Sequence, residues 1–251
     1  MRKFILLLPL FLFVQVVFPQ ELENRKETAF KPGEELKYRL RYGFITAAEA
    51  TLNVLDSDVK FDNKPVFHLV AQGKTAASFN LFYKVRNRYD SYIDRTDLTP
   101  YLYTENIREA NYRRTDKVRF YQDQKKVVGN KGTFKGKEKT FDLVSAFFFA
   151  RSLDLSRVRP GTLFTIPYFL DDEVADMKIT YVGKETIKTP IGTFNCLKFN
   201  PSIKPGRIFR KDSKLYLWIT DDGNRIPVKA QVEILVGSVT LEVTSAKGLK
   251  Y

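Results

Sequence analysis

The chain has 251 residues, a formal net charge of +13, one cysteine and one histidine. A single cysteine excludes an internal disulfide, and a single histidine excludes a metal site built on several histidines. The lone histidine also leaves no second histidine for a catalytic triad. The absence of such a metal site and of such a triad counts against an enzyme, and we expect neither a metal ion nor a cofactor.

The first residues have the pattern of a secretory signal peptide. A positive start, Met1-Arg2-Lys3, precedes an apolar run over residues 4–18 and a charged stretch over 21–26. The run is too short to cross a bilayer comfortably, although an uncleaved anchor is the alternative. We therefore expect residues 1–20 to be a signal peptide. Residues 21–251 would then form one β domain, exported to the periplasm or outer envelope and soluble after cleavage.

Alternation of apolar and polar residues dominates the rest of the chain. In segment 35–42, Leu36, Tyr38, Leu40 and Tyr42 share one face. After a turn at 43–46, segment 48–54 alternates in the same way and completes a hairpin. Such one-sided alternation is typical of antiparallel sheets with one buried face. The pattern recurs at 66–71, 85–93, 101–109, 112–122, 125–129, 162–169, 174–182, 184–188, 193–199, 215–220, 228–234 and 239–243.

Turn residues separate these segments. The run Asp221-Asp222-Gly223-Asn224 predicts a hairpin with Gly223 at a position of positive φ. Pro167 and Pro227 lie inside strand-like runs, which places them at sheet edges or strand starts. The acidic groups at 171–173 and 221–224 fit turns better than a calcium site, because they lack the spacing of an EF-hand. Further turns are predicted at 31–33, 189–192 and 204–206.

One segment breaks the strand pattern. Residues 142–153 begin with the N-cap residue Asp142, and apolar residues then follow at helical spacing. A second short aromatic piece, helical or looped, covers 75–83. The predicted fold is therefore all-β: a single curved antiparallel sheet or open β-barrel, with one short helix at about 142–153 packed on its concave side.

Several short motifs are spread along the chain: Gly33-Glu34-Glu35-Leu36-x-Tyr38, Tyr42-Gly43, Asp142-x-x-Ser145-Ala146-Phe147-Phe148-x-x-Arg151-x-Leu153, Thr189-Pro190-x-Gly192-Thr193-Phe194, Leu217-Trp218-x-Thr220-Asp221-Asp222, Arg225-Ile226-Pro227-Val228 and Ile234-x-x-Gly237-Ser238. Their combined spacing covers most of the chain from about Phe30 to Leu241 and resembles that of the exported bacterial family catalogued as domain of unknown function 3108. The resemblance implies location and fold more than chemistry, because that family has no settled activity.

Positive charge is concentrated in two segments. Residues 113–139 hold ten basic and three acidic residues, and residues 201–214 hold five basic and one acidic. Clustered positive charge attracts anionic partners, which in an envelope are membrane surfaces and acidic glycans rather than nucleic acid. The alternative is a solvated face that lysines keep soluble. The residues predicted to contact an anionic surface are Arg113, Arg114, Lys117, Arg119, Lys125 and Lys126.

Aromatic residues supply the second candidate site. On a curved sheet they could line a concave surface for an acyl chain, or they could simply fill the core. The residues predicted to bind such a ligand are Phe79, Phe82, Phe147, Phe148 and Phe169.

These features predict a non-enzymatic envelope protein that binds a lipid, lipoprotein or other apolar-tailed anionic ligand. The alternative is an interaction module that docks proteins through an exposed strand edge. An envelope hydrolase is a third hypothesis, weakened by the missing apparatus for water activation.

Overall fold

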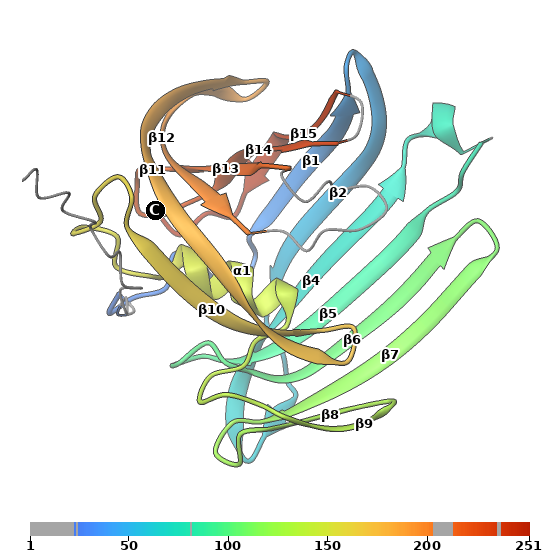
Figure 1. Cartoon of the computed structure of the whole chain (residues 1–251), viewed down its shortest axis with the longest axis vertical. Coiled ribbons are helices and arrows are strands. Elements are labelled where there is room, and N and C mark those ends of the chain that lie inside the picture. Colours follow the sequence, from blue (N-terminus) through green and yellow to red (C-terminus); the bar gives the residue numbers. More distant parts are fainter. Residues whose placement is uncertain (1–22, 24, 81, 203–212, 235–236) are drawn as a thin grey trace, which may run out of the picture.

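The computed structural model describes residues 23, 25–80, 82–202, 213–234 and 237–251. The predicted signal peptide and the turn at 204–206, with most of the second basic segment, lie outside the described residues. A single antiparallel sheet forms nearly all of the described part and curves around one α-helix (Figure 1). The predicted fold class is therefore confirmed.

The strands follow one another closely along the chain. They are β1 (Glu35–Tyr42), β2 (Ile45–Leu55), β3 (Lys60–Phe61), β4 (Lys64–Thr75), β5 (Arg86–Asp94), β6 (Pro100–Glu109), β7 (Tyr112–Tyr121), β8 (Lys126–Gly129), β9 (Gly132–Lys135), β10 (Leu163–Leu170), β11 (Glu173–Thr189), β12 (Gly192–Pro201), β13 (Leu215–Thr220), β14 (Pro227–Glu233) and β15 (Ser238–Lys247). A 3-10 turn, η1 (Ala77–Phe79), and the helix α1 (Leu143–Arg151) complete the described elements.

The sheet consists of two meanders joined by the first and last strands. Its order is β10-β11-β12-β13-β14-β15-β1-β2-β4-β5-β6-β7-β8-β9, with β3 paired to β4 alone. The β1–β15 pairing runs from Glu35 opposite Lys247 to Tyr42 opposite Val239. The two strands at the ends of this order, β9 and β10, are consecutive in the chain and separated by α1.

Alternation along the strands divides the sheet into an inner and an outer face. Leu36 and Tyr38 of β1 are buried, whereas Lys37 between them is exposed. Val54 and Leu69, which are paired across β2 and β4, have no exposed surface and belong to the main core. Because side chains alternate between faces, this buried face is the one that surrounds α1, and the basic residues of β1 point outward.

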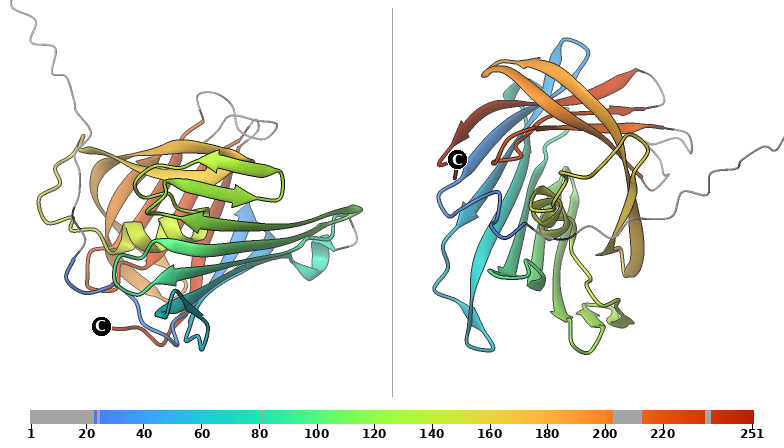
Figure 2. Two further views of the ribbon diagram at one scale, coloured as in Figure 1. Left: turned by 90° about the horizontal axis from the view of Figure 1, so that it is seen from below. Right: turned by 90° about the vertical axis from the view of Figure 1, so that its left-hand side faces the viewer.

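The helix α1 lies inside the curve of the sheet, as predicted. Figure 2 (right) looks along it and shows the strands arranged around it. Asp142 caps its N-terminus by accepting hydrogen bonds from the backbone N–H groups of Val144 and Ser145, both at 2.9 Å. Phe148 is fully buried and meets Phe30 edge-on, with ring centroids 4.9 Å apart.

The two end strands approach each other through side chains. Phe134 of β9 packs against Phe169 of β10, with ring centroids 5.1 Å apart. Lys131 and Asp172 form an ion pair at 2.6 Å, and Arg114 reaches Asp171 at 3.2 Å. We call this line of contacts between β9 and β10 the seam. It narrows the opening of the barrel without backbone pairing between the two strands.

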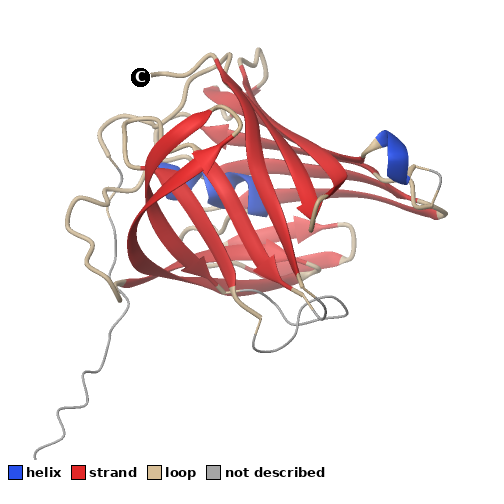
Figure 3. Ribbon diagram, turned by 90° about the horizontal axis from the view of Figure 1, so that it is seen from above, coloured by secondary structure: helices blue, strands red, loops and turns tan. Residues whose placement is uncertain are grey.

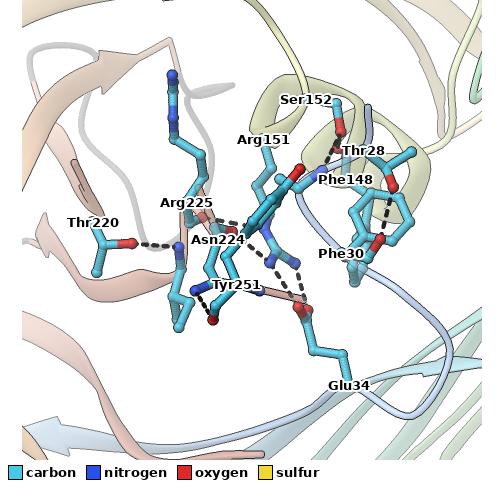
Figure 4. A network of polar contacts seen from close by, with 12 residues as sticks. Thr28, Phe30, Glu34, Phe148, Arg151, Ser152, Thr220, Asn224, Arg225 and Tyr251 are labelled. Atoms are coloured by element: carbon cyan, nitrogen blue, oxygen red, sulfur yellow. Dashed lines mark hydrogen bonds and ion pairs between the residues drawn. The ribbon is translucent and has the colours of Figure 1, made fainter. Parts of the chain in front are cut away.

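A buried ion pair connects the helix to distant parts of the chain (Figure 4). Arg151 and Glu34, both 1% exposed, form two hydrogen bonds of 2.7 and 3.0 Å. Arg151 also donates to the carbonyl oxygens of Asn224 and Arg225. One guanidinium therefore joins the end of α1, the segment before β1 and the turn before β14.

The turns follow their predicted positions with one correction. Pro227 is the first residue of β14 and Pro167 lies in the end strand β10, as expected. The turn after Thr220 forms, but its residue of positive φ is Arg225 at 50° and not Gly223. The Asp222 carboxylate accepts hydrogen bonds from the N–H groups of Asn224 and Arg225. These bonds stabilise a conformation that the glycine was predicted to supply.

Candidate functional site

The five aromatic residues predicted to bind a ligand are divided between two places. Phe148 and Phe169 are buried in the core, and Phe147 packs against that core. Phe79 and Phe82 lie in the connection between β4 and β5, at the far end of long projecting strands (Figure 3). The structure does not bring the five onto one surface, and their role in binding stays a prediction.

The predicted basic face is also divided. Arg113 and Lys117 are exposed on the outer face of β7. Arg114 points to the inner face, where it forms ion pairs with Glu105 at 2.8 Å and Asp116 at 3.1 Å. The other members of the predicted set differ from one another. Arg119 lies 4.3 Å from the Phe61 ring centroid, Lys126 lies 4.5 Å from that of Tyr121, and Lys125 occupies a turn with φ of 48°.

A groove on the outer face is the candidate site. It has a volume of about 1010 Å³ and crosses β1, β2, β4, β5 and β6. Side chains paired across these strands form rows along it, because residues opposite each other share a face. One row contains Lys37, Thr51, Gln72, Arg88 and Asn106, and the next contains Arg39, Glu49, Lys74 and Arg86.

The groove has a positive charge. Its acidic lining residues are Glu35 and Glu49, and its basic lining residues are Lys37, Arg39, Lys74, Arg86, Arg88 and Arg108. The gaps between these long side chains contain the small residues Ala50 and Gly73, and Asn87 and Asn106 add amide groups. The lining therefore combines cations with uncharged donors, which suits an anionic ligand rather than a cation.

Two of these arginines have no carboxylate partner within the described parts of the chain. Arg86 donates to the Val85 carbonyl at 2.5 Å and to Thr75 Oγ1 at 3.4 Å. Arg108 donates to Asn106 Oδ1 at 3.1 Å. Neutral acceptors leave the positive charge uncompensated, so Arg86 and Arg108 are the strongest candidates to meet an anion.

Arg88, beside them, is already paired. It forms two hydrogen bonds of 2.7 and 2.8 Å with Asp90, which also contacts His68 Nε2 at 2.7 Å. Burial by itself would raise the pKa of Asp90, but the hydrogen bonds from His68 and Arg88 lower it below its ordinary value. Asp90 therefore stays ionised and offsets the charge of Arg88.

The sequence contains a signal for this groove, but counting basic residues within continuous segments did not reveal it. The outward positions of β1 alternate as Lys37, Arg39 and Arg41, and those at the start of β5 as Arg86 and Arg88. Each strand contributes only two or three cations, so no single segment is strongly basic. The cluster arises from pairing of strands that are far apart in the chain.

The part of the chain that the structure describes offers little support for a metal site, a reactive thiol or a membrane-spanning helix. No group of three or more His, Cys, Asp or Glu there could hold a metal ion. Burial raises the pKa of the Cys196 thiol to about 11, which keeps it protonated at neutral pH. No helix of the described residues is both long and apolar enough to cross a membrane.

Comparisons with known proteins identify structures of similar fold and the family of the chain. No curated protein matches the chain. Among solved structures, the beta-barrel-like protein of domain of unknown function DUF1849 from Brucella abortus is similar in fold. The two have a TM-score of 0.56 and 8% identity, and the match covers 85% of this chain and 96% of that one. A protein of YmcC-like fold from Bacteroides fragilis aligns with a TM-score of 0.38 and 13% identity, over 87% and 97% of the two chains. The model of the family described as protein of unknown function DUF3108 matches residues 37–244, and the chain belongs to that family.

Proposed function

We propose that this protein is a non-enzymatic, exported protein of the cell envelope that binds an anionic lipid by its headgroup. The observation that carries the proposal is the positively charged groove on the outer face of β1, β2 and β4–β6. Six basic and two acidic side chains line its volume of about 1010 Å³. That volume is in the range of sites that hold ligands of moderate size.

The chemistry of the groove favours phosphate over carboxylate as the anion. Arginine offers a planar fork of N–H donors that matches phosphate oxygens, and Arg86 and Arg108 supply two such groups. The amides of Asn87 and Asn106 can donate to further phosphate or ester oxygens. An anionic phospholipid combines this headgroup with the apolar tail that the sequence led us to expect.

The strand-edge interaction module receives less support. Both end strands of the sheet take part in the seam, where Phe134 packs on Phe169 and Lys131 pairs with Asp172. A partner strand would have to displace these contacts before it could pair with β9 or β10. We therefore retain ligand binding as the proposed function.

A binding measurement with a soluble lipid tests the proposal. A short-chain phosphatidylglycerol below its aggregation concentration should bind the wild-type protein in isothermal titration calorimetry. The double variant Arg86→Gln/Arg108→Gln should weaken binding by at least about tenfold, because it removes charge-assisted hydrogen bonds. The matched control, Lys178→Gln/Lys188→Gln on exposed positions of β11, removes the same charge elsewhere and should bind normally. Equal binding by both double variants, or no binding by the wild type, would refute the proposal.

A further inference from the structure

Three strand connections lie together at one end of the barrel. They join β1 to β2, β4 to β5 and β6 to β7. Consecutive antiparallel strands place alternate connections at the same end, and Figure 1 shows these three on one side. Backbone hydrogen bonds confirm their proximity: Ala76 N donates to Ala47 O at 3.0 Å, and Ala110 N to Lys84 O at 2.7 Å. We call the three connections the hairpin rim.

An exposed aromatic side chain lies in or directly beside each connection of the hairpin rim. Phe44 is 98% exposed, Phe82 is 84% exposed and Tyr112 is 53% exposed. Ile45 and Tyr83, their neighbours in the chain, are also about half exposed. Scattered exposed apolar residues are normal, but large aromatics gathered on one edge indicate an interaction surface.

Basic residues surround these aromatics. Segments 41–49, 74–86 and 107–114 together contain seven basic residues and two acidic ones. Arg41, Lys74 and Arg114 pair with carboxylates, which leaves the charges of Lys84, Arg86, Arg108 and Arg113 without a described carboxylate partner. Lys84 and Arg113 are exposed, and Arg113 Nη1 donates to the backbone carbonyls of Ala110 and Tyr112. The hairpin rim therefore presents projecting apolar tips within a positively charged border.

The groove reaches this end of the sheet. Its lining includes Thr46, Lys74, Arg86 and Arg108, each near the end of a strand that leads into the hairpin rim. Arg86 and Arg108, the two groove arginines without a described carboxylate partner, thus lie at the end of the groove nearest the aromatic tips. A ligand held at the hairpin rim would be close to the groove.

We propose that the hairpin rim docks on the surface of an anionic bilayer, from which lipid enters the groove. Phe44 and Phe82 insert at the level of the headgroups, while Lys84 and Arg113 face lipid phosphates. Apolar side chains that insert beside cations are the usual design of interfacial binding. The proposal of a docking surface depends only on the observations at the hairpin rim, whereas the transfer of lipid into the groove rests on the proposed function.

A bilayer fits the hairpin rim better than a protein partner does. The exposed aromatics come from three separate connections, and the exposed basic residues Lys84 and Arg113 adjoin Tyr83 and Tyr112 in the chain. Protein interfaces bury a contiguous and closely complementary area. A bilayer surface adapts to separate tips, and its negative charge complements the border of the hairpin rim.

Vesicle cosedimentation tests the docking surface. At low ionic strength the wild-type protein should bind vesicles that contain phosphatidylglycerol and bind pure phosphatidylcholine vesicles much more weakly. The variant Phe44→Ser/Phe82→Ser should lower the partition coefficient by about a hundredfold, because each buried phenylalanine accounts for roughly tenfold. The control Leu55→Ser/Val59→Ser changes exposed apolar residues at the opposite end and should bind like the wild type.

A charge variant and a binding measurement with a soluble lipid distinguish the proposed docking surface from the proposed lipid binding in the groove. Lys84→Glu/Arg113→Glu should also abolish vesicle binding, and neither residue lines the groove described above. The serine variant should still bind soluble phosphatidylglycerol, whereas Arg86→Gln/Arg108→Gln should lose that binding and keep part of its vesicle binding. Unchanged vesicle binding by the serine variant refutes the docking surface. So does a wild-type protein whose exposed aromatics mediate self-association in light scattering and not vesicle binding.

Discussion

The buried pair of Arg151 and Glu34 shows how one residue can hold together segments that are far apart in the chain. Its guanidinium donates to the Glu34 carboxylate and to the carbonyls of Asn224 and Arg225. Both residues fall in motifs of the family resemblance, Glu34 just before β1 and Arg151 on the helix. The sequence nevertheless contains no local indication that they meet, because 117 positions separate them.

Removing one partner of this pair should be costly. Glu34→Gln leaves a buried guanidinium without its counter-charge, so we expect a loss of about 3–5 kcal/mol in the free energy of unfolding. Urea unfolding followed by Trp218 fluorescence measures it. Asp221→Asn breaks the exposed pair with Lys184 and should cost less than about 1 kcal/mol. The double variant Glu34→Leu/Arg151→Met should recover part of the loss. Equal costs for the buried and the exposed single variants would contradict this account.

At the scale of elements, the helix depends on its surroundings. With nine residues α1 is too short to be stable alone, so its cap and its packing must maintain it. The Asp142 carboxylate accepts four hydrogen bonds, from two backbone N–H groups and from the hydroxyls of Ser91 and Ser145. The bond from Ser91 attaches the helix start to β5.

Substitution at Asp142 should therefore destabilise the whole sheet and not the helix alone. We expect Asp142→Ala to cost about 2–4 kcal/mol at neutral pH, because it removes the cap and leaves a buried hydroxyl unpaired. Asp142→Asn retains a capping oxygen and should recover much of the loss. The measurement is urea unfolding monitored by both far-ultraviolet and near-ultraviolet circular dichroism. Selective loss of the helical signal, with the aromatic signal intact, would show that the helix is independent of the sheet.

At the scale of the whole molecule, the sequence predicts those elements that depend on a periodic pattern or on residues close together in the chain. The strands, the capped helix and most turns follow from alternation, from Asp142 and from proline and glycine positions. The groove could not be predicted, because it forms only when β1, β2, β4, β5 and β6 align in register. The segment around Phe79 and Phe82 is as aromatic as that around Phe147 and Phe148. The topology nevertheless places the first segment in the connection between β4 and β5 and the second on the helix inside the sheet.

Because β1 pairs with β15, the segments that flank these two strands lie close together. The chain could therefore be joined at this place and opened at another position. Lys250 Nζ contacts the Thr28 carbonyl at 3.0 Å, and the Arg25 guanidinium lies 5.8 Å from the Tyr251 ring centroid. A short glycine-serine linker can therefore join Tyr251 to Arg25.

A circular permutant opened between Ser156 and Arg157, both exposed, would run from β10 through β15 and then from β1 to α1. Every strand of the main sheet would then pair with its neighbour in sequence. We expect this permutant to fold to the same structure and, because its contacts are more local, to refold faster after dilution from urea. A permutant that folds but refolds at the wild-type rate would show that the long-range β1–β15 contact does not limit folding.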